Sequence, residues 1–204
     1  MERALPPPRF FRAVIFGSAR VEAGDDAYED ARTLARALSK NGIDIVTGGG
    51  PGIMEAASRG AMEGRTNKRV WSWGVCIEQL NREEEPNAFL SRAYKHRNFF
   101  TRLHQFARLG GCGVFVVMPG GFGSDLEEAT ILQLLQVRHL KEALLIEIGQ
   151  MWREKIAWRK KWMVPHFASS DDVTGNIISF DHAIEALPVI LEAHHRFKGL
   201  RVAS

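Results

Sequence analysis

The sequence predicts an α/β fold in which a central, mostly parallel sheet lies between two layers of helices. Short apolar runs typical of buried strands alternate with longer segments that place alanine and leucine at helical spacing. Three of these runs end in glycine-containing turns that lead into a helix. Because strand–helix–strand connections of this kind are right-handed crossovers between parallel strands, we expect one Rossmann-like, three-layer αβα domain over residues 1–204.

The first half of the chain contains two strand–glycine–helix units. Residues 13–20 (AVIFGSAR) are a β-rich apolar run that ends in a glycine-serine turn, as expected for a buried parallel strand. Residues 25–40 have helical spacing, and the Asn-Gly pair that follows is a typical helix C-cap. Residues 43–47 form a second apolar strand, which runs directly into a glycine cluster and an alanine-rich helix. The charged, proline-rich residues 1–12 are expected to form an N-terminal arm.

The second half of the chain continues the same alternation. A third strand is expected at residues 70–77 and, after an acidic loop, a short strand near residues 89–94. A helix from about residue 98 to 109 precedes the run 113–118, which is hydrophobic on both faces and should therefore be central in the sheet. A glycine-rich turn and a third helix follow this run. The remaining elements are expected to be a strand at 143–148 and helices around 151–161 and 181–197.

Composition limits the classes of function. The 204 residues include 27 Lys and Arg against 24 Asp and Glu, spread along the chain, which gives a net charge of +3. This balance is too mild to indicate nucleic acid binding, and it suits anionic metabolites. Cys76 and Cys112 are the only cysteines; we expect both to be buried in a reduced, cytoplasmic protein. Because no run approaches the ~20 apolar residues that a bilayer span needs, we expect no membrane segment, and we expect no metal site.

Three glycine clusters mark the expected binding site. They are Gly17-Ser18, residues 48–52 (GGGPG) and residues 119–124 (PGGFGS), and each follows a strand at the edge where open α/β sheets bind ligands. Glycine lets the backbone approach an anion closely, and the N–H groups that start the next helix favour a phosphate. One cluster alone could be a tight turn, but three favour a shared anion pocket. No Walker lysine and no GxGxxG pattern is present, which disfavours ATP hydrolysis and NAD binding.

Charged residues near these clusters indicate the chemistry. Asp125, Glu127 and Glu128 lie in the first turn of the helix after the third cluster, where one or two acids could simply complement the helix dipole. A carboxylate there also lies where a ribose would extend from a bound phosphate, and it could stabilise an oxocarbenium charge. Arg97 and Arg102 offer a cation for the phosphate or the departing base, although surface arginines are usually only solvated. The combination favours cleavage of a glycosyl bond.

Two motifs resemble the signatures of a known family. Residues 48–57 (GGGPGIMEAA) and 119–128 (PGGFGSDLEE) resemble the motifs of the LOG proteins, cytokinin riboside 5′-monophosphate phosphoribohydrolases that are often labelled possible lysine decarboxylases. The resemblance covers most of the chain and is closer to the longer bacterial members. It implies that Glu127 is the catalytic glutamate and that Arg102, in Phe-Phe-Thr-Arg, is the catalytic arginine. The implied activity is hydrolysis of the N-glycosidic bond of AMP or an N6-modified AMP by a homodimer that uses no cofactor.

The sequence departs from the family pattern beside the expected arginine. Leu103 stands where the family has lysine, and Lys95-His96-Arg97-Asn98 loosely imitates the arginine string of shorter members, so Arg97 is the alternative catalytic arginine. The rival hypothesis, which Leu103 favours, is a non-catalytic nucleotide sensor or carrier. Lysine decarboxylation ranks last, because no glycine motif contains the lysine that pyridoxal phosphate needs. The residues expected to bind substrate and phosphate are Gly17, Ser18, Gly49, Gly50, Met118, Gly120, Gly121, Gly123 and Ser124.

A basic, tryptophan-rich segment occupies residues 151–167. Such a composition could indicate binding to nucleic acid or to a membrane surface. However, Trp158 and Trp162 are four residues apart and share one helix face, while the charges can take the other. The segment therefore predicts an amphipathic helix whose tryptophans pack on the sheet or on a dimer partner.

Overall fold

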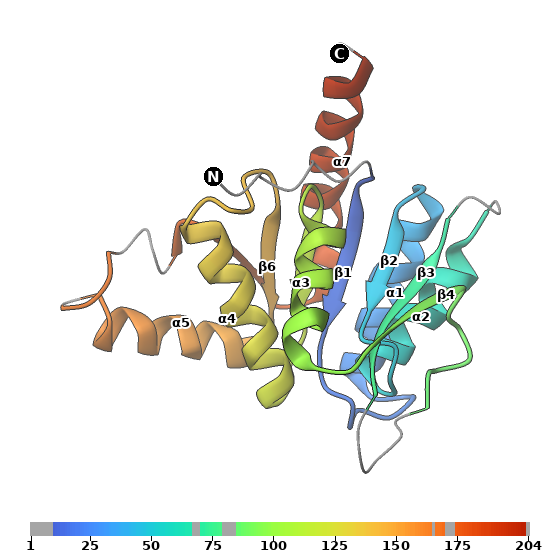
Figure 1. Cartoon of the computed structure of the whole chain (residues 1–204), viewed down its shortest axis with the longest axis horizontal. Helices are drawn as coiled ribbons and strands as arrows, with labels where there is room; N and C mark the ends of the chain where they lie inside the picture. The colour runs from blue at the N-terminus through green and yellow to red at the C-terminus, as the bar shows by residue number, and fades with distance from the viewer. Residues whose placement is uncertain (1–9, 67–69, 79–84, 165, 170–173, 203–204) are drawn as a thin grey trace.

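The protein is a three-layer αβα sandwich (Figure 1), seen in a computed structural model that describes residues 10–66, 70–78, 85–164, 166–169 and 174–202. Seven strands form one sheet in the order β4-β3-β2-β1-β5-β6-β7, and every neighbouring pair is parallel. The predicted Rossmann-like fold is confirmed. The strands are β1 Arg12–Phe16, β2 Asp44–Thr47, β3 Ser72–Ile77, β4 Arg92–His96, β5 Val114–Val117, β6 Leu144–Ile148 and β7 Ile177–Phe180.

Helices cover both faces of the sheet and create two apolar cores. One core contains side chains of α1, α2, η1 and α7, and the other contains side chains of α3, α4 and α5. Strand β5 contributes Val114 and Val116 to the first core and Phe115 and Val117 to the second, so the prediction of a central strand with two buried faces is confirmed. The helices are α1 Asp26–Lys40, α2 Ile53–Gly64, α3 Phe99–Gly110, α4 Phe122–Gln136, α5 Gln150–Trp162, η1 Ala183–Ala186 and α7 Leu187–Val202.

Several smaller predictions are confirmed. Helix α1 ends at an Asn41 C-cap followed by Gly42 at φ 80°, which is the left-handed conformation that glycine adopts without strain. Cys76 and Cys112 are both buried.

No helix in the described part of the chain is long and apolar enough to cross a membrane.

The ends of the sheet differ from the prediction. Strand β4 begins at Arg92 rather than near residue 89, because it is an exposed edge strand with little apolar pattern. Strand β7 was not predicted; it has four half-buried or exposed residues and therefore no strong apolar signal. The expected final helix starts as the short 3₁₀ helix η1. Residues 1–9 of the expected arm, and residues 79–84 in the acidic loop, lie outside the described residues.

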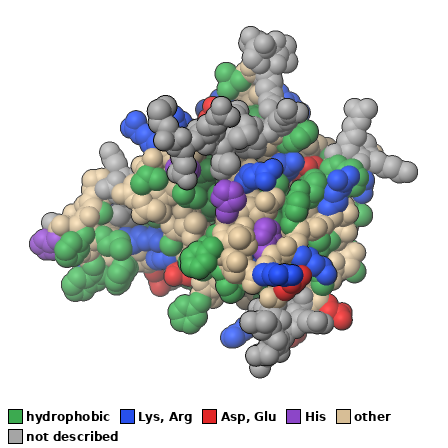
Figure 2. All heavy atoms as spheres, viewed as in Figure 1, with side chains coloured by type: hydrophobic (Ala, Val, Ile, Leu, Met, Phe, Trp, Pro, Cys, Tyr) green, Lys and Arg blue, Asp and Glu red, His purple; other side chains and the backbone are tan. Residues whose placement is uncertain are grey.

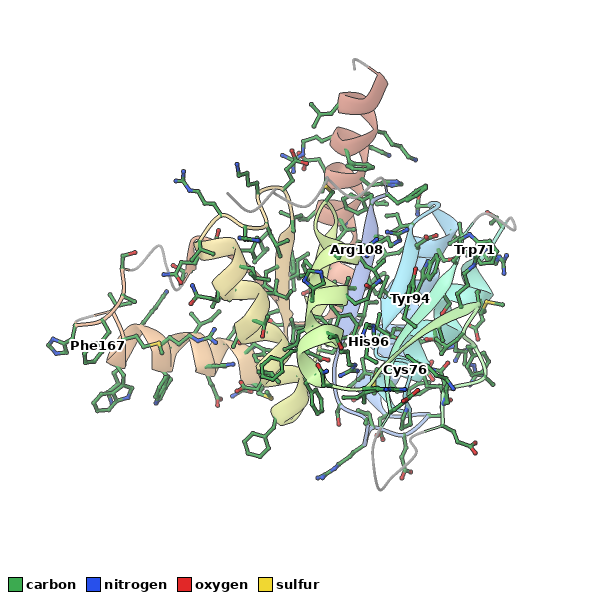
Figure 3. All side chains as sticks on the ribbon, in the orientation of Figure 1. Trp71, Cys76, Tyr94, His96, Arg108 and Phe167 are labelled. Atoms are coloured by element: carbon green, nitrogen blue, oxygen red, sulfur yellow. The ribbon has the colours of Figure 1, made fainter. Side chains whose placement is uncertain are left out.

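Of the two surfaces predicted for Trp158 and Trp162, the sheet is wrong, and packing on a dimer partner stays a prediction. Both side chains are 55% exposed, whereas Trp152 and Arg159 on the neighbouring side of α5 are buried. Helix α5 runs out from the edge of the sheet (Figure 1), and Phe167 lies beyond its end, far from the core (Figure 3). Arg159 points inward because the buried carboxylate of Glu128 on α4 pairs with it, which leaves Trp158 and Trp162 on the outside.

Candidate active site

The three glycine clusters meet where the strand order reverses. Strand β1 lies between β2 and β5, and the loops after these three strands carry the clusters. The backbone of Ser18 joins them: its N–H donates to Pro119 O at 3.1 Å, and its carbonyl accepts from Ile53 N at 2.9 Å. Open α/β sheets bind ligands at such a switch point. The predicted convergence of the three strand ends is therefore present in the structure.

A cavity of about 730 Å³ lies at this point. Its walls come from the loops after β1 and β5, from the end of β3, from α1, α2 and α3, and from the first two turns of α4. The apolar walls include Met54, Ile77 and Phe99, which the sequence analysis did not identify. Eight predicted site residues line the cavity: Gly17, Ser18, Arg102, Gly120, Gly121, Gly123, Ser124 and Glu127.

The other three predicted residues lie behind the lining. Asn87 holds the second glycine loop: its N–H donates to Gly49 O at 2.8 Å, and its amide Nδ2 donates to Gly49 O at 3.1 Å and to Gly50 O at 3.0 Å. Met118 is buried, and its carbonyl accepts from Trp152 Nε1 at 3.2 Å. These residues shape the loops instead of facing the cavity.

Arg102 and Glu127 form an ion pair in the cavity wall. The Arg102 side chain is 11% exposed and the Glu127 side chain 9%, and Arg102 Nη1 lies 3.2 Å from Glu127 Oε1. Arg102 is fixed further by donation from Nε to Val75 O at 2.8 Å and by its position over the Phe106 ring, 5.1 Å from the centroid. The guanidinium therefore has a defined orientation before any ligand binds.

The second glycine cluster makes room for this arginine. A Cβ added to Gly48 would lie 2.2 Å from Arg102 Nη2 and 2.6 Å from Met54 Sδ. Real Cβ atoms do not approach other atoms this closely, so any larger residue would displace the guanidinium. Close packing also operates in the third cluster, where a Cβ on Gly120 would lie 2.1 Å from Ser124 Oγ. The glycines thus permit contacts between loops as well as exposing backbone N–H groups.

Burial sets the protonation of Glu127. Desolvation raises the pKa of its carboxyl from 4.5 to about 7, and the positive charge of Arg102 opposes this only in part. A carboxyl with a pKa near neutrality exchanges protons readily at physiological pH. Perturbed acids in a cleft are typical of catalytic sites.

The remaining charged candidates lie in other places. The Arg97 side chain is 92% exposed and pairs with Glu78 at 3.9 Å, and Arg102 is the one of the two arginines that lines the cavity. Arg20, which the sequence analysis did not select, also lines the cavity; its position two residues after Ser18 was the available signal. Asp125 and Glu128 pair with cations of α5 rather than lining the cavity.

The carboxyl ends of β3 and β4 complete this edge of the sheet, as the labelled Cys76 and His96 show (Figure 3). His96 Nδ1 lies 3.2 Å from Thr101 Oγ1. Burial, with a smaller contribution from the charge of Arg102, lowers the pKa of His96. The environment thus favours the neutral imidazole beside the cationic arginine.

Similar proteins fall into two groups. The pyrimidine/purine nucleotide 5′-monophosphate nucleosidase of Escherichia coli strain K12 is 28% identical over 124 residues, which are 59% of this chain and 27% of that protein. The chain thus matches about a quarter of the length of this relative. The molybdenum cofactor binding protein of Rippkaea orientalis has a TM-score of 0.65 at 14% identity, covering 92% of this chain and 98% of that one. The molybdenum cofactor carrier protein of Chlamydomonas reinhardtii has a TM-score of 0.63 at 16% identity, covering 91% and 98%.

The solved structures are too distant in sequence to show more than a shared fold. Family models are more informative. A model described as "SLOG cluster4 family" matches residues 11–89, and a model described as "Possible lysine decarboxylase" matches residues 54–190. The second match covers more than half of the sequence and includes Arg102, Glu127 and the Pro-Gly-Gly loop. The chain therefore belongs to the LOG family, whose model carries the description "possible lysine decarboxylase".

Proposed function

We propose that this protein hydrolyses the N-glycosidic bond of a nucleoside 5′-monophosphate, AMP or an N6-modified AMP, and releases the free base and ribose 5-phosphate. The observation that carries the proposal is the Arg102–Glu127 pair, buried in the wall of a cavity that two of the three glycine loops line. The nucleosidase similarity over 124 residues supports the same class of reaction.

The phosphate would occupy the loop that opens α4. Gly121 is the N-cap of this helix and has no side-chain cap hydrogen bond, so the first N–H groups and the positive end of the helix dipole are available to an anion. Arg20 adds a positive charge to the cavity wall, and no ion pair involves it among the described residues. An anion at this position places the attached ribose beside Glu127, which lies about one turn further along α4.

The carboxylate of Glu127 would act on the ribose. As the bond between C1′ and the base nitrogen lengthens, positive charge develops on the ribose, and a nearby carboxylate stabilises it. Water then adds its oxygen to C1′ and loses a proton to Glu127, and Glu127 passes a proton to the base nitrogen that left C1′, which returns the carboxylate to its ionised form. A pKa of about 7 suits a group that must be ionised first and must accept a proton later. Arg102, which keeps its charge, would orient Glu127 and contact the departing base.

A nucleotide sensor or carrier is the second candidate. Leu103 occupies the position of the family lysine, which removes a charge next to Arg102. Two proteins that share the fold are described as a cofactor binding protein and a cofactor carrier. A fold alone does not decide between carriage and turnover, so a direct assay is needed. Lysine decarboxylation has less support, since no described residue that lines the cavity is a lysine.

We also propose that this single domain works as a cytoplasmic homodimer. Phe100 and Phe122 flank the cavity wall on α3 and α4, and their side chains are 85% and 96% exposed. Hydrophobic side chains also gather on the surface along α5 (Figure 2). Exposed apolar clusters on a soluble chain commonly mark protein interfaces, and a second copy that covers Phe122 would also enclose the mouth of the cavity.

The decisive experiment is release of ribose 5-phosphate from a panel of AMP, GMP, CMP, UMP and N6-isopentenyl-AMP, with Glu127→Gln as the control. We expect release from at least one purine monophosphate and none from the variant. Binding of a monophosphate without release, in the wild-type protein, would establish the carrier instead.

A further inference from the structure

A buried ionic cluster lies directly behind the candidate active site. Glu128, the residue after Glu127, is fully buried, and Arg159 donates Nη1 and Nη2 to its two carboxylate oxygens, each at 2.7 Å. Lys155 Nζ donates to the same carboxylate at 2.6 Å and also pairs with Asp125. Two cations of α5 thus bind two acids in the first two turns of α4.

This start of α4 carries the residues of the proposed chemistry. Glu127 and Glu128 are consecutive in a helix, so their side chains point about 100° apart. Glu127 faces the cavity and Arg102, whereas Glu128 faces α5. The N-cap of α4 has no side-chain hydrogen bond, and the pairs to α5 are the ion pairs that hold this part of α4 from behind among the described residues.

Helix α5 also contacts the other end of the Pro-Gly-Gly loop. Trp152 is fully buried, and its indole Nε1 donates to the carbonyl of Met118, the residue immediately before Pro119, at 3.2 Å. The loop therefore lies between two contacts with one helix: Trp152 at its start, and Lys155 with Arg159 at its end. A shift of α5 would move both ends of the loop together.

We infer that α5 is a clamp that sets the position of the Pro-Gly-Gly loop and of Glu127, with Trp152, Lys155 and Arg159 as positioning residues. None of the three lines the cavity, so each acts through the start of α4 or through Met118. This role accounts for three residues of the basic, tryptophan-rich segment.

A second buried acid makes the clamp sensitive to pH. Glu147 on β6 is 1% exposed, and neither carboxylate oxygen has a hydrogen-bond partner among the described residues. Burial and then the negative charge of Glu128 raise the pKa of Glu147 to about 8. The charged groups that face it are Glu128 from α4 and Arg159 and Lys155 from α5, and its register partners on β5 and β7 are uncharged. An ionised Glu147 would compete with Glu128 for Arg159.

The test compares Arg159→Met with Arg153→Met, a matched change on the same helix. Arg153 pairs with Asp181 and touches neither α4 nor the cavity lining. We expect Arg159→Met to lower kcat by about 100-fold, since small misplacements of catalytic groups have effects of this size, and Arg153→Met to leave kcat unchanged. Arg159→Lys, which keeps the charge, should retain most of the wild-type kcat. Wild-type kcat in Arg159→Met, with the fold intact, would overturn the inference.

The kinetic comparison rests on the proposed function. Hydrogen exchange tests the clamp without assuming that function. In the ligand-free protein, the amides of residues 121–128 should exchange at least about tenfold faster in Arg159→Met than in Arg153→Met, with the strands unchanged. Faster exchange confined to α5 would overturn the clamp whatever reaction the protein performs. If Arg159→Met does not fold, the same comparison is made with Lys155→Met, which removes the other cation that pairs with Glu128 and Asp125. In addition, we expect kcat of the wild-type protein to fall above about pH 8, where Glu147 ionises, and kcat of Glu147→Gln to stay constant there. The same fall in both proteins would show that Glu147 does not act on the clamp.

Discussion

Replacing Glu127 with glutamine should abolish turnover and stabilise the fold. The folded pKa of about 7 lies above the ordinary value of 4.5 because the carboxyl is buried. Between these two values the folded chain holds a proton that the unfolded chain has released, so stability falls as the pH rises through this window and remains lower above it. The shift corresponds to roughly 3 kcal/mol. Glutamine resembles the neutral acid and avoids this cost.

The assay is urea unfolding of the wild-type protein and Glu127→Gln at about pH 4.5 and about pH 8. We expect little difference at the lower pH and a gain of roughly 3 kcal/mol at the higher pH, which corresponds to a rise in Tm of about 10 °C for a chain of this size. Glu192→Gln, at a side chain that is 71% exposed, is the control and should show no pH-dependent gain. An equal effect of Glu127→Gln at both pH values would refute the reasoning, because it would mean that burial does not penalise the charge.

Three further predictions concern the same site. Arg102→Met should lower kcat by at least about 100-fold, whereas Arg97→Met should have no effect, as measured by ribose 5-phosphate release. Gly48→Ala should displace the guanidinium and lower kcat by about tenfold or more, with Gly199→Ala as the control because a Cβ there meets nothing within 4 Å; equal rates for the two alanine variants would refute the steric argument. Phe122→Ser should shift sedimentation from dimer to monomer, and a wild-type sedimentation profile would exclude this surface from the interface.

The sequence predicted the centre of the fold better than its edges. The run 114–117 is apolar at every position because both faces of β5 are covered, and such a pattern has few alternative explanations. Strand β7 is short and has little buried surface, so its sequence resembles that of a loop. Pairing with β6 makes it a strand, and this long-range contact has no local signature.

In the candidate site, too, features with a local sequence pattern were predictable and features that depend on long-range contacts were not. The loop positions were predictable because glycines after apolar strands have a local meaning. The need for glycine at position 48 was not predictable. It arises because Arg102, from a helix about 50 residues further along the chain, packs against this position. The buried face of α5 was equally inaccessible: the spacing of Trp158 and Trp162 identifies one helix face correctly, but Arg159 can be buried only because Glu128 is there to pair with it.

The two consecutive glutamates of the third motif show how environment assigns roles to identical groups. Burial alone would raise the pKa of Glu128, but hydrogen bonds from Arg159 and Lys155 outweigh it and lower that pKa. Glu127 has one cationic partner, and burial raises its pKa to about 7. One acid is thus a permanent anion that anchors the helix, and its neighbour titrates at the cavity. Because Glu127 faces the cavity and can accept a proton there, this pairing supports the proposed turnover more directly than carriage.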